Sequence, residues 1–465
     1  LFPYTTLFRS LRALGTDDLR ALTTAQIVAL NSAQLASLTT TQVAAMTTAQ
    51  VATIETGDVS ALSSAQVGAF NTAHVAALTT AQIAQLTTTE LRGLTTVTAP
   101  ALTTAQVVAL SSDQLASLSS TQLASFNTAQ IASIETRDLA GLNSAQLRAL
   151  NTDDVHALTT AQIVALSSAQ LSSLTTTQVA ALTTAQVATI ETGDIGGLTS
   201  TQVGAFNTAQ VAALTTAQIA QMTTSELRGL NTADTAALTT AQVVALSSDQ
   251  LASLTSTQLA SFNTAQIAAI ETGDIGGFTS TQIGALNTAQ VAAITTAQIA
   301  QMTTSELRGL NTADAAALTT AQVVALSSDQ IGSLTTTQVA AMTTAQVASI
   351  ETADIGGLTT TQMIALGTSG IHAMTTAQIV ALNSAQLAVL TTAEVDSLTT
   401  AQIVALETAD LRALTTVEIQ ALGTHHFAAM TTLEVQSLTT AQLRAMETVD
   451  VHALTTAHIV ALTSD

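Results

Sequence analysis

The sequence predicts an all-α fold, a superhelical α-solenoid in which each eight-residue repeat forms one short, capped helix. Three observations lead to this prediction. A Leu, Ile, Met or Phe recurs at every eighth residue from Leu14 to Leu462, so that the chain between them divides into 56 octads without insertion or deletion. Nearly every octad also carries a helix-capping motif in the same place, and most acidic and basic residues occupy different positions of the octad. So strict a frame indicates that each unit packs on its neighbours.

The octad has two apolar sites, which we expect to form the core. We count from the apolar anchor, so that Leu22 is position 1 and Ala29 is position 8. Position 6 is the second apolar site, and only Ala99, Thr235 and Ala315 lack a large apolar side chain there. Helices this short are unstable alone, so positions 1 and 6 must be buried against other octads. Ala at positions 4 and 8 is expected to let helices approach closely.

The polar positions predict where each helix begins. Position 2 is Thr, Ser, Asn, Glu or Gly, and position 5 is nearly always Gln, Glu, Asp or His, as in Thr23 and Gln26. This is the capping box, in which the first side chain accepts from the N3 amide and the N3 side chain reaches back to the cap amide. Positions 1 and 6 then occupy the two sites of a hydrophobic staple.

Charge placement supports the same frame. Carboxylates such as Glu55 and Asp113 lie at positions 2, 4 and 5, where a helix dipole favours negative charge. Cations lie at position 7, in the last turn: Arg12, Arg20, Arg92, Arg148, Arg228, Arg308, Arg412 and Arg444, with His156, His372 and His452. Glycines concentrate at positions 7 and 8, near the helix end. A β-solenoid with Thr ladders remains the alternative, because Thr, Val and Ile favour strands.

A single continuous helix is disfavoured. Eight residues make about 2.2 turns of α-helix, so the apolar positions would rotate by ~80° per octad around a straight helix. Paired Thr residues also suit caps better than helix interiors.

The ends of the chain and three internal segments depart from the pattern. Residues 1–10, LFPYTTLFRS, have no octad frame and resemble a translated adapter remnant, which leaves residues 11–465 as one solenoid. The last octad is incomplete and no initiator Met is present, so we expect a fragment of a longer protein. Softer points are expected near 91–102, 227–238 and 307–318, where the weak position-6 residues follow Leu-Arg-Gly-Leu.

Composition excludes several classes of function. The net charge is −21 and Lys is absent, which argues against nucleic acid, because such binding needs Lys and Arg against phosphates. No apolar stretch is long enough to span a membrane. No Cys is present, so thiolate chemistry is excluded and the redox compartment cannot be inferred. The Ser and Thr recur without a fixed His or acid partner, so we expect no enzyme, no catalytic residue and no cofactor.

Three residue pairs are candidates for metal binding. His425 and His426 are adjacent, but neighbours on a helix face different ways, and a solvated capping variant is the favoured interpretation. The pairs Asp17-Asp18 and Asp153-Asp154 could hold a cation weakly, although the helix dipole already explains acids at these positions. No metal site is therefore predicted.

The motif LTTAQ(V/I)xxL, present from Leu22, Leu102 and Leu398, resembles octapeptide arrays found in very large bacterial proteins of the surface-associated or secreted type. The resemblance covers residues 14–462 and concerns the repeat, not an activity. It implies a non-enzymatic stalk or interaction scaffold of an adhesin-like protein at the cell surface or outside the cell. Its partner would be an unidentified protein or surface ligand.

Two alternatives remain open. One is an intracellular protein-binding scaffold, because a chain without Cys suits either compartment. The other is a regular Thr array that binds ice or a crystalline surface, although capping would occupy one Thr of each pair.

Overall fold

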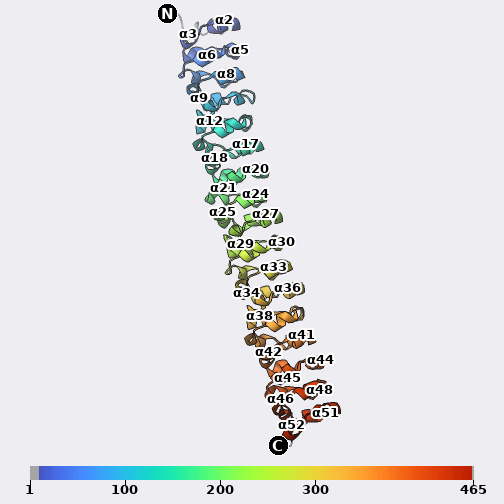
Figure 1. Cartoon of the computed structure of the whole chain (residues 1–465). Helices are drawn as coiled ribbons and strands as arrows, with labels where there is room; N and C mark the ends of the chain where they lie inside the picture. Colours follow the sequence, from blue (N-terminus) through green and yellow to red (C-terminus); the bar gives the residue numbers. More distant parts are fainter. Residues whose placement is uncertain (1–9, 463–465) are drawn as a thin grey trace. The chain divides into compact units, whose positions relative to one another are not determined.

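The computed structural model describes residues 10–462, which form two compact units, one ending at Ala237 and the other beginning at Leu238. The predicted interpretation of residues 1–10 therefore lies outside the described residues, apart from Ser10. Short helices make up both units, and no strand occurs between residues 10 and 462 (Figure 1). The predicted all-α solenoid is confirmed, and the β-solenoid alternative is not supported.

The helices of the first unit are α2 (Thr16–Ala21), α3 (Thr24–Val28), α4 (Ser32–Ser37), α5 (Thr40–Ala45), α6 (Thr48–Thr53), η1 (Val59–Ala61), α7 (Ser64–Val67), α8 (Thr72–Ala77), α9 (Thr80–Gln85), α10 (Thr88–Leu91), η2 (Ala99–Ala101), α11 (Thr104–Val108), α12 (Ser112–Ser117), α13 (Ser120–Leu123), α14 (Thr128–Ser133), α15 (Thr136–Leu139), α16 (Ser144–Ala149), α17 (Thr152–Ala157), α18 (Thr160–Val164), α19 (Ser168–Ser173), α20 (Thr176–Ala181), α21 (Thr184–Thr189), α22 (Thr192–Ile195), α23 (Ser200–Val203), α24 (Thr208–Ala213), α25 (Thr216–Gln221), α26 (Thr224–Gly229) and α27 (Thr232–Ala237).

The helices of the second unit are α28 (Thr240–Val244), α29 (Ser248–Ser253), α30 (Ser256–Ala260), α31 (Thr264–Ala269), η3 (Ile275–Gly277), α32 (Ser280–Ile283), α33 (Thr288–Ala293), α34 (Thr296–Gln301), α35 (Thr304–Leu307), α36 (Thr312–Ala317), α37 (Thr320–Val324), α38 (Ser328–Ser333), α39 (Thr336–Ala340), α40 (Thr344–Ser349), η4 (Thr352–Gly357), α41 (Thr360–Ala373), α42 (Thr376–Val380), α43 (Ser384–Leu387), α44 (Thr392–Asp396), α45 (Thr400–Ala405), α46 (Thr408–Ala413), α47 (Thr416–Ala421), α48 (Thr424–Ala429), α49 (Thr432–Ser437), α50 (Thr440–Ala445), α51 (Thr448–Ala453) and α52 (Thr456–Leu462).

The α-helices begin at position 3 of the octad, as the capping motif predicts. In α3, Thr23 is the N-cap in extended conformation (φ −70°, ψ 157°), and its side chain accepts a hydrogen bond from the backbone N–H of Gln26. The Oε1 atom of Gln26 accepts from the Thr23 N–H at 2.8 Å. The two extended residues at positions 1 and 2 thus form the bend between successive helices.

A few octads deviate from this pattern. Four contain a 3₁₀ helix instead of an α-helix, at η1, η2, η3 and η4. In α41, two octads run together across a kink at Gly367, whose φ of 63° lies in the left-handed region that glycine tolerates.

The core consists of positions 1 and 6, as expected. Leu150 and Val155 are representative, with 4% and 0% of their surface exposed. The three weak position-6 residues, Ala99, Thr235 and Ala315, are equally buried, at 0 to 2%. The softness expected around these residues stays a prediction.

Close helix contacts involve position 8 but not position 4. Alanines at position 4, such as Ala209, are exposed, so the expectation that they line the helix contact is wrong. At position 8, each of the seven glycines faces a serine at position 3 of the octad three units earlier, and a Cβ on Gly357 would overlap the backbone of Ser328. These pairs are Ser64 with Gly93, Ser112 with Gly141, Ser168 with Gly197, Ser200 with Gly229, Ser248 with Gly277, Ser280 with Gly309, and Ser328 with Gly357.

Helices stack at a separation of three octads, a number that the sequence left open. In the first unit α17 packs against α20, the helix of the third octad after it, and in the second α45 packs against α48. One superhelical turn within each unit therefore takes about three octads. Inside each unit, helices away from its ends contact the corresponding helices of the turns before and after them.

Candidate functional site

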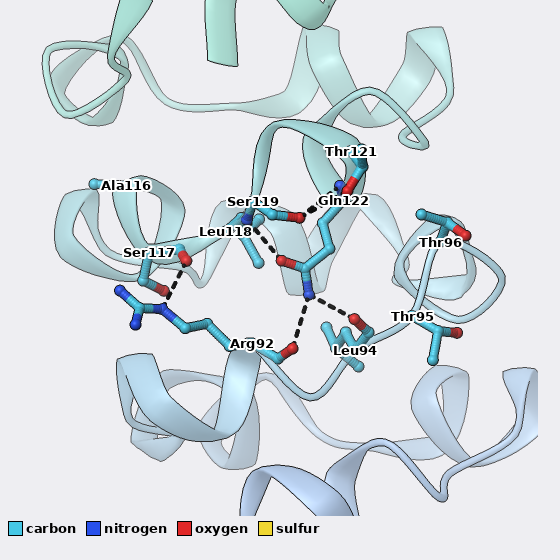
Figure 2. Close-up of a pocket in the computed structure, with 10 residues that line it drawn as sticks. All are labelled: Arg92, Leu94, Thr95, Thr96, Ala116, Ser117, Leu118, Ser119, Thr121 and Gln122. Atoms are coloured by element: carbon cyan, nitrogen blue, oxygen red, sulfur yellow. Dashed lines mark hydrogen bonds between the residues drawn. The ribbon is translucent and has the colours of Figure 1, made fainter. Parts of the chain in front are cut away.

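The most frequent polar contact between turns belongs to the Gln at position 5. Figure 2 shows one example, Gln122, whose Oε1 accepts the Ser119 N–H while its Nε2 donates to the carbonyl of Leu94 at 2.5 Å. A second carbonyl, that of Leu91, lies 3.2 Å from the same nitrogen. The acceptors stand 28 and 31 residues before the Gln, so one amide both caps its own helix and binds the preceding turn.

Sequence reasoning predicted the capping role of position 5 but missed this second role. From Gln42 onward the glutamines there are buried, for example Gln186 at 2% exposed. The available signal was the preference for Gln over Glu, because both residues complete a capping box but only Gln carries an N–H donor. Position 5 therefore needs one acceptor and one donor on an uncharged side chain.

Histidine at position 5 meets the same requirement. In His426, Nδ1 accepts the Gly423 N–H at 3.1 Å, and Nε2 lies 2.6 Å from the Leu398 carbonyl, 28 residues earlier. This arrangement requires a neutral ring with its proton on Nε2. Burial lowers the pKa of His426, while the bond to Leu398 raises it to a smaller extent. His74 and His458 contact the carbonyls of Met46 and Met430 in the same way.

Acids at position 5 cannot meet the requirement when ionised. The Oε2 atom of Glu306 accepts the Thr303 N–H at 2.5 Å, but its Oε1 is buried without a hydrogen-bond partner. Burial raises the pKa of Glu306, and its hydrogen bonds lower it by less. The Oδ2 atom of Asp314 is likewise buried and unpartnered, and burial raises its pKa. Glu226 and Asp234, at the equivalent places ten octads earlier, have the same orphan oxygens.

A second class of acid at position 5 has a partner of its own. In the octads that contain Ile-Glu-Thr, the Asp accepts a hydrogen bond from a serine hydroxyl 26 residues earlier, as Asp138 does from Ser112 at 2.7 Å. The other pairs are Ser32 with Asp58, Ser168 with Asp194, Ser248 with Asp274, and Ser328 with Asp354. The expected capping by glutamate at position 2 is absent here, since Glu135 makes no side-chain cap.

Most of the cations at position 7 contact the next turn. The Nε atom of Arg92 donates to the Ser117 carbonyl at 3.2 Å, 25 residues later, at the C-terminus of α12. The same contact joins Arg148 to Ser173 and Arg412 to Ser437. A helix C-terminus favours positive charge, so these cations stabilise a neighbouring helix.

Shallow surface hollows accompany these cations. The one beside Arg92 has a volume of about 590 Å³ and is lined by hydroxyl groups of Thr95, Thr96, Ser119 and Thr121 (Figure 2). The hollow is open to solvent, and the Arg92 guanidinium already donates to the C-terminal end of α12. We assign it no chemistry.

The rings of His425 and His426 lie side by side, with centroids 3.8 Å apart, but the members of two of the three candidate metal pairs differ in burial. His425 is exposed while His426 is fully buried, so the interpretation of His426 as a solvated variant is wrong. Asp153 is exposed and Asp154 is buried, with its Oδ2 accepting the Asn151 N–H at 3.1 Å. Burial is the main cause that raises the pKa of Asp154.

The pair Asp17 and Asp18 lies at the surface, where Asp18 accepts the Gly15 N–H at 3.2 Å. Among residues 10–462 no three His, Asp or Glu side chains gather closely enough to hold a metal ion. Over the same range no helix combines the length and the apolar character needed to cross a bilayer.

The comparison with protein families gives an independent identification of the repeat. The family model of the ALTTAQ repeat matches residues 11–48, 51–88, 131–168, 187–264, 267–304, 307–344 and 347–464, where several of these stretches combine overlapping matches. No curated protein matches the chain. The matched residues cover well over half of the sequence, and their frame is that of the octads in the structure. The chain therefore belongs to the ALTTAQ repeat family.

Proposed function

We propose that this chain is a non-enzymatic stalk or interaction scaffold within a larger bacterial adhesin-like protein of the cell surface or the secreted fraction. One observation carries the proposal: within each unit, helices pack against the helices three octads before and after them. Whole turns can therefore be added without any new kind of contact. A domain of adjustable length suits a spacer better than a catalyst, which needs one fixed arrangement of groups.

The surface chemistry supports the same proposal. Exposed positions carry mainly Thr, Ser and Ala, and charged residues are only 9% of the chain. The resemblance to repeat arrays of large bacterial surface proteins supports the cellular location. We do not extend the proposal to ice binding, because the Thr23 hydroxyl already accepts the Gln26 N–H and its counterparts do the same in other octads.

The location can be tested with single introduced cysteines, because the natural chain has none. Ala209→Cys places a thiol at an exposed position on α24, and Val203→Cys places one at a buried position in the same unit. Intact cells that express the full protein are treated with a membrane-impermeant maleimide. The proposal expects labelling of Ala209→Cys and not of Val203→Cys. If Ala209→Cys reacts only after cell lysis, the surface location is wrong and the intracellular scaffold is favoured.

A further inference from the structure

The orphan carboxyl oxygens of Glu306 and Asp314 lie where other octads place an amide donor. In the neighbouring octads, Gln298 donates to the Ile270 carbonyl at 2.6 Å and Gln322 donates to the Ile294 carbonyl at 2.6 Å, each 28 residues earlier. By the same spacing of 28 residues, the equivalent carbonyl for Glu306 is that of Phe278.

An ionised carboxylate cannot replace the amide at this place. It has acceptors only, and the carbonyl that position 5 binds in other octads is also an acceptor. Both side chains are 1% exposed, so water does not compensate for the missing donor. A protonated carboxyl supplies the donor, because its O–H takes the place of the amide N–H while the second oxygen still accepts the cap N–H.

Within the described part of the chain, the helices packed against Glu306 and Asp314 carry no cationic side chain that could neutralise an ionised carboxylate. Glu306 lies on α35, which packs against α32 and α38, and the only charged side chain on those two helices is the exposed Asp329. On α35 itself, the C-terminal cap Arg308 donates through Nε to the Ser333 carbonyl at 2.8 Å. Asp314 lies on α36, between α33 and α39, which carry no charged residue. In the preceding turn, Asp274 is held by Ser248.

We propose that Glu306 and Asp314 form a proton-operated clamp between successive turns of the second unit. With a proton bound, each carboxyl donates to the preceding turn and the two turns are joined. Ionisation removes the donor and leaves two oxygens opposed, so the contact opens locally. Glu226 and Asp234 repeat the arrangement in the first unit, in a block copied at a distance of ten octads.

The sign of the pH dependence follows from the raised pKa values of both groups. The folded chain binds these protons more tightly than the unfolded chain does. The stabilisation is fully present below the ordinary carboxyl pKa and is lost as pH rises through the raised value. Local opening becomes about tenfold more favourable for each pKa unit by which a carboxyl is raised.

The experiment compares hydrogen exchange of residues 302–317 in the full chain between pH 4 and pH 8, after correction for intrinsic exchange rates. The test variant is Glu306→Gln with Asp314→Asn, and the control is Asp249→Asn with Asp329→Asn, which removes the same charge from two exposed sites. We expect protection to fall with rising pH in the natural chain and in the control, and to stay constant and high in the test variant. Gln is the usual residue at position 5, so the single variant Glu306→Gln is expected to fold. It replaces the double variant if that variant does not fold.

Carboxyl ¹³C chemical shifts of Glu306 and Asp314 provide the second measurement. A titration midpoint above the ordinary carboxyl range supports the clamp. Ordinary midpoints, or equal pH dependence of protection in the natural chain and the test variant, overturn it.

Discussion

At the scale of single residues, position 5 determines how firmly successive turns are joined. The capping role of Gln could be predicted, because a capping box is local and its spacing is visible in the sequence. The contact of Gln186 with the carbonyls of Val155 and Leu158 could not, because it depends on how many octads make one turn. For the same reason, His426 was expected in solvent and is buried.

Replacing Gln186 by Glu tests the need for a donor. Its Nε2 donates to Leu158 at 2.6 Å and to Val155 at 2.9 Å, and Glu would place an acceptor there instead. We expect a loss of about 1 to 3 kcal/mol of local stability at neutral pH, the usual result of a buried unsatisfied group. Hydrogen exchange of residues 150–190 measures the loss. The control Gln85→Glu, at an exposed position, should change little.

The pH response of His426 should be opposite in sign to that of the buried acids. Burial lowers its pKa, so the unfolded chain binds the proton more tightly. The segment around His426 has its full stability above about pH 6.5, the ordinary pKa of His. Its stability falls as the pH decreases from there toward the lowered pKa. Exchange of residues 424–430 at pH 7.5 and 5.0 reports the change.

His426→Gln should abolish this response, whereas His425→Gln, a change of the exposed neighbour, should leave it in place. A natural chain whose protection in this segment is the same at both pH values would contradict the neutral-ring assignment.

At the scale of helices, the octad frame gave correct starting points and a correct core, because caps and apolar spacing are local signals. The surfaces through which helices meet were only half predicted. Ala at position 4 is exposed, and contact occurs instead through position 8, where glycine approaches a serine backbone. The single chain contained this signal, because each such glycine is matched by a serine at position 3 of the octad three units before it. The match becomes meaningful once the three-octad turn is known.

Two adjacent glycines in η4 provide a matched test of this contact. A Cβ at Gly357 would overlap the backbone of Ser328, whereas a Cβ at Gly356 would have no heavy atom within 4 Å. We expect Gly357→Ala to destabilise the unit by about 1 to 3 kcal/mol through overpacking. Gly356→Ala should be neutral or slightly stabilising. Exchange protection of residues 325–358 measures both, and equal effects would show that the contact is not tight.

At the scale of the whole molecule, the fold class and the repeat family followed from the sequence, but the number of octads per turn did not. That number depends on how side chains at positions 1, 5, 6 and 8 fit together across turns. The described units satisfy these contacts every three octads, as α17 and α20 illustrate.

We expect the fold to tolerate a deletion of whole octads better than a shorter deletion that breaks the octad frame. Removal of residues 158–181, three whole octads, joins Ala157 to Leu182 and keeps every later octad in frame. Removal of residues 158–177 deletes fewer residues but shifts the anchors by half an octad. We expect the longer deletion to retain helical circular dichroism per residue and cooperative melting, and the shorter one to lose protection on both sides of the junction. Equal tolerance of both deletions would contradict the packing described above.

The glycine and serine contacts also bear on how such a uniform chain avoids winding incorrectly. Nearly every octad offers the same amide and the same carbonyls, so a coil that slips by one octad during folding still forms most of its hydrogen bonds. Folding can start at many points in such an array, and slipped segments become kinetic traps. A slip separates Gly357 from Ser328 and forces a larger residue against that backbone. We therefore expect the glycine and serine contacts to make the native register of the coil more stable than registers shifted by one octad.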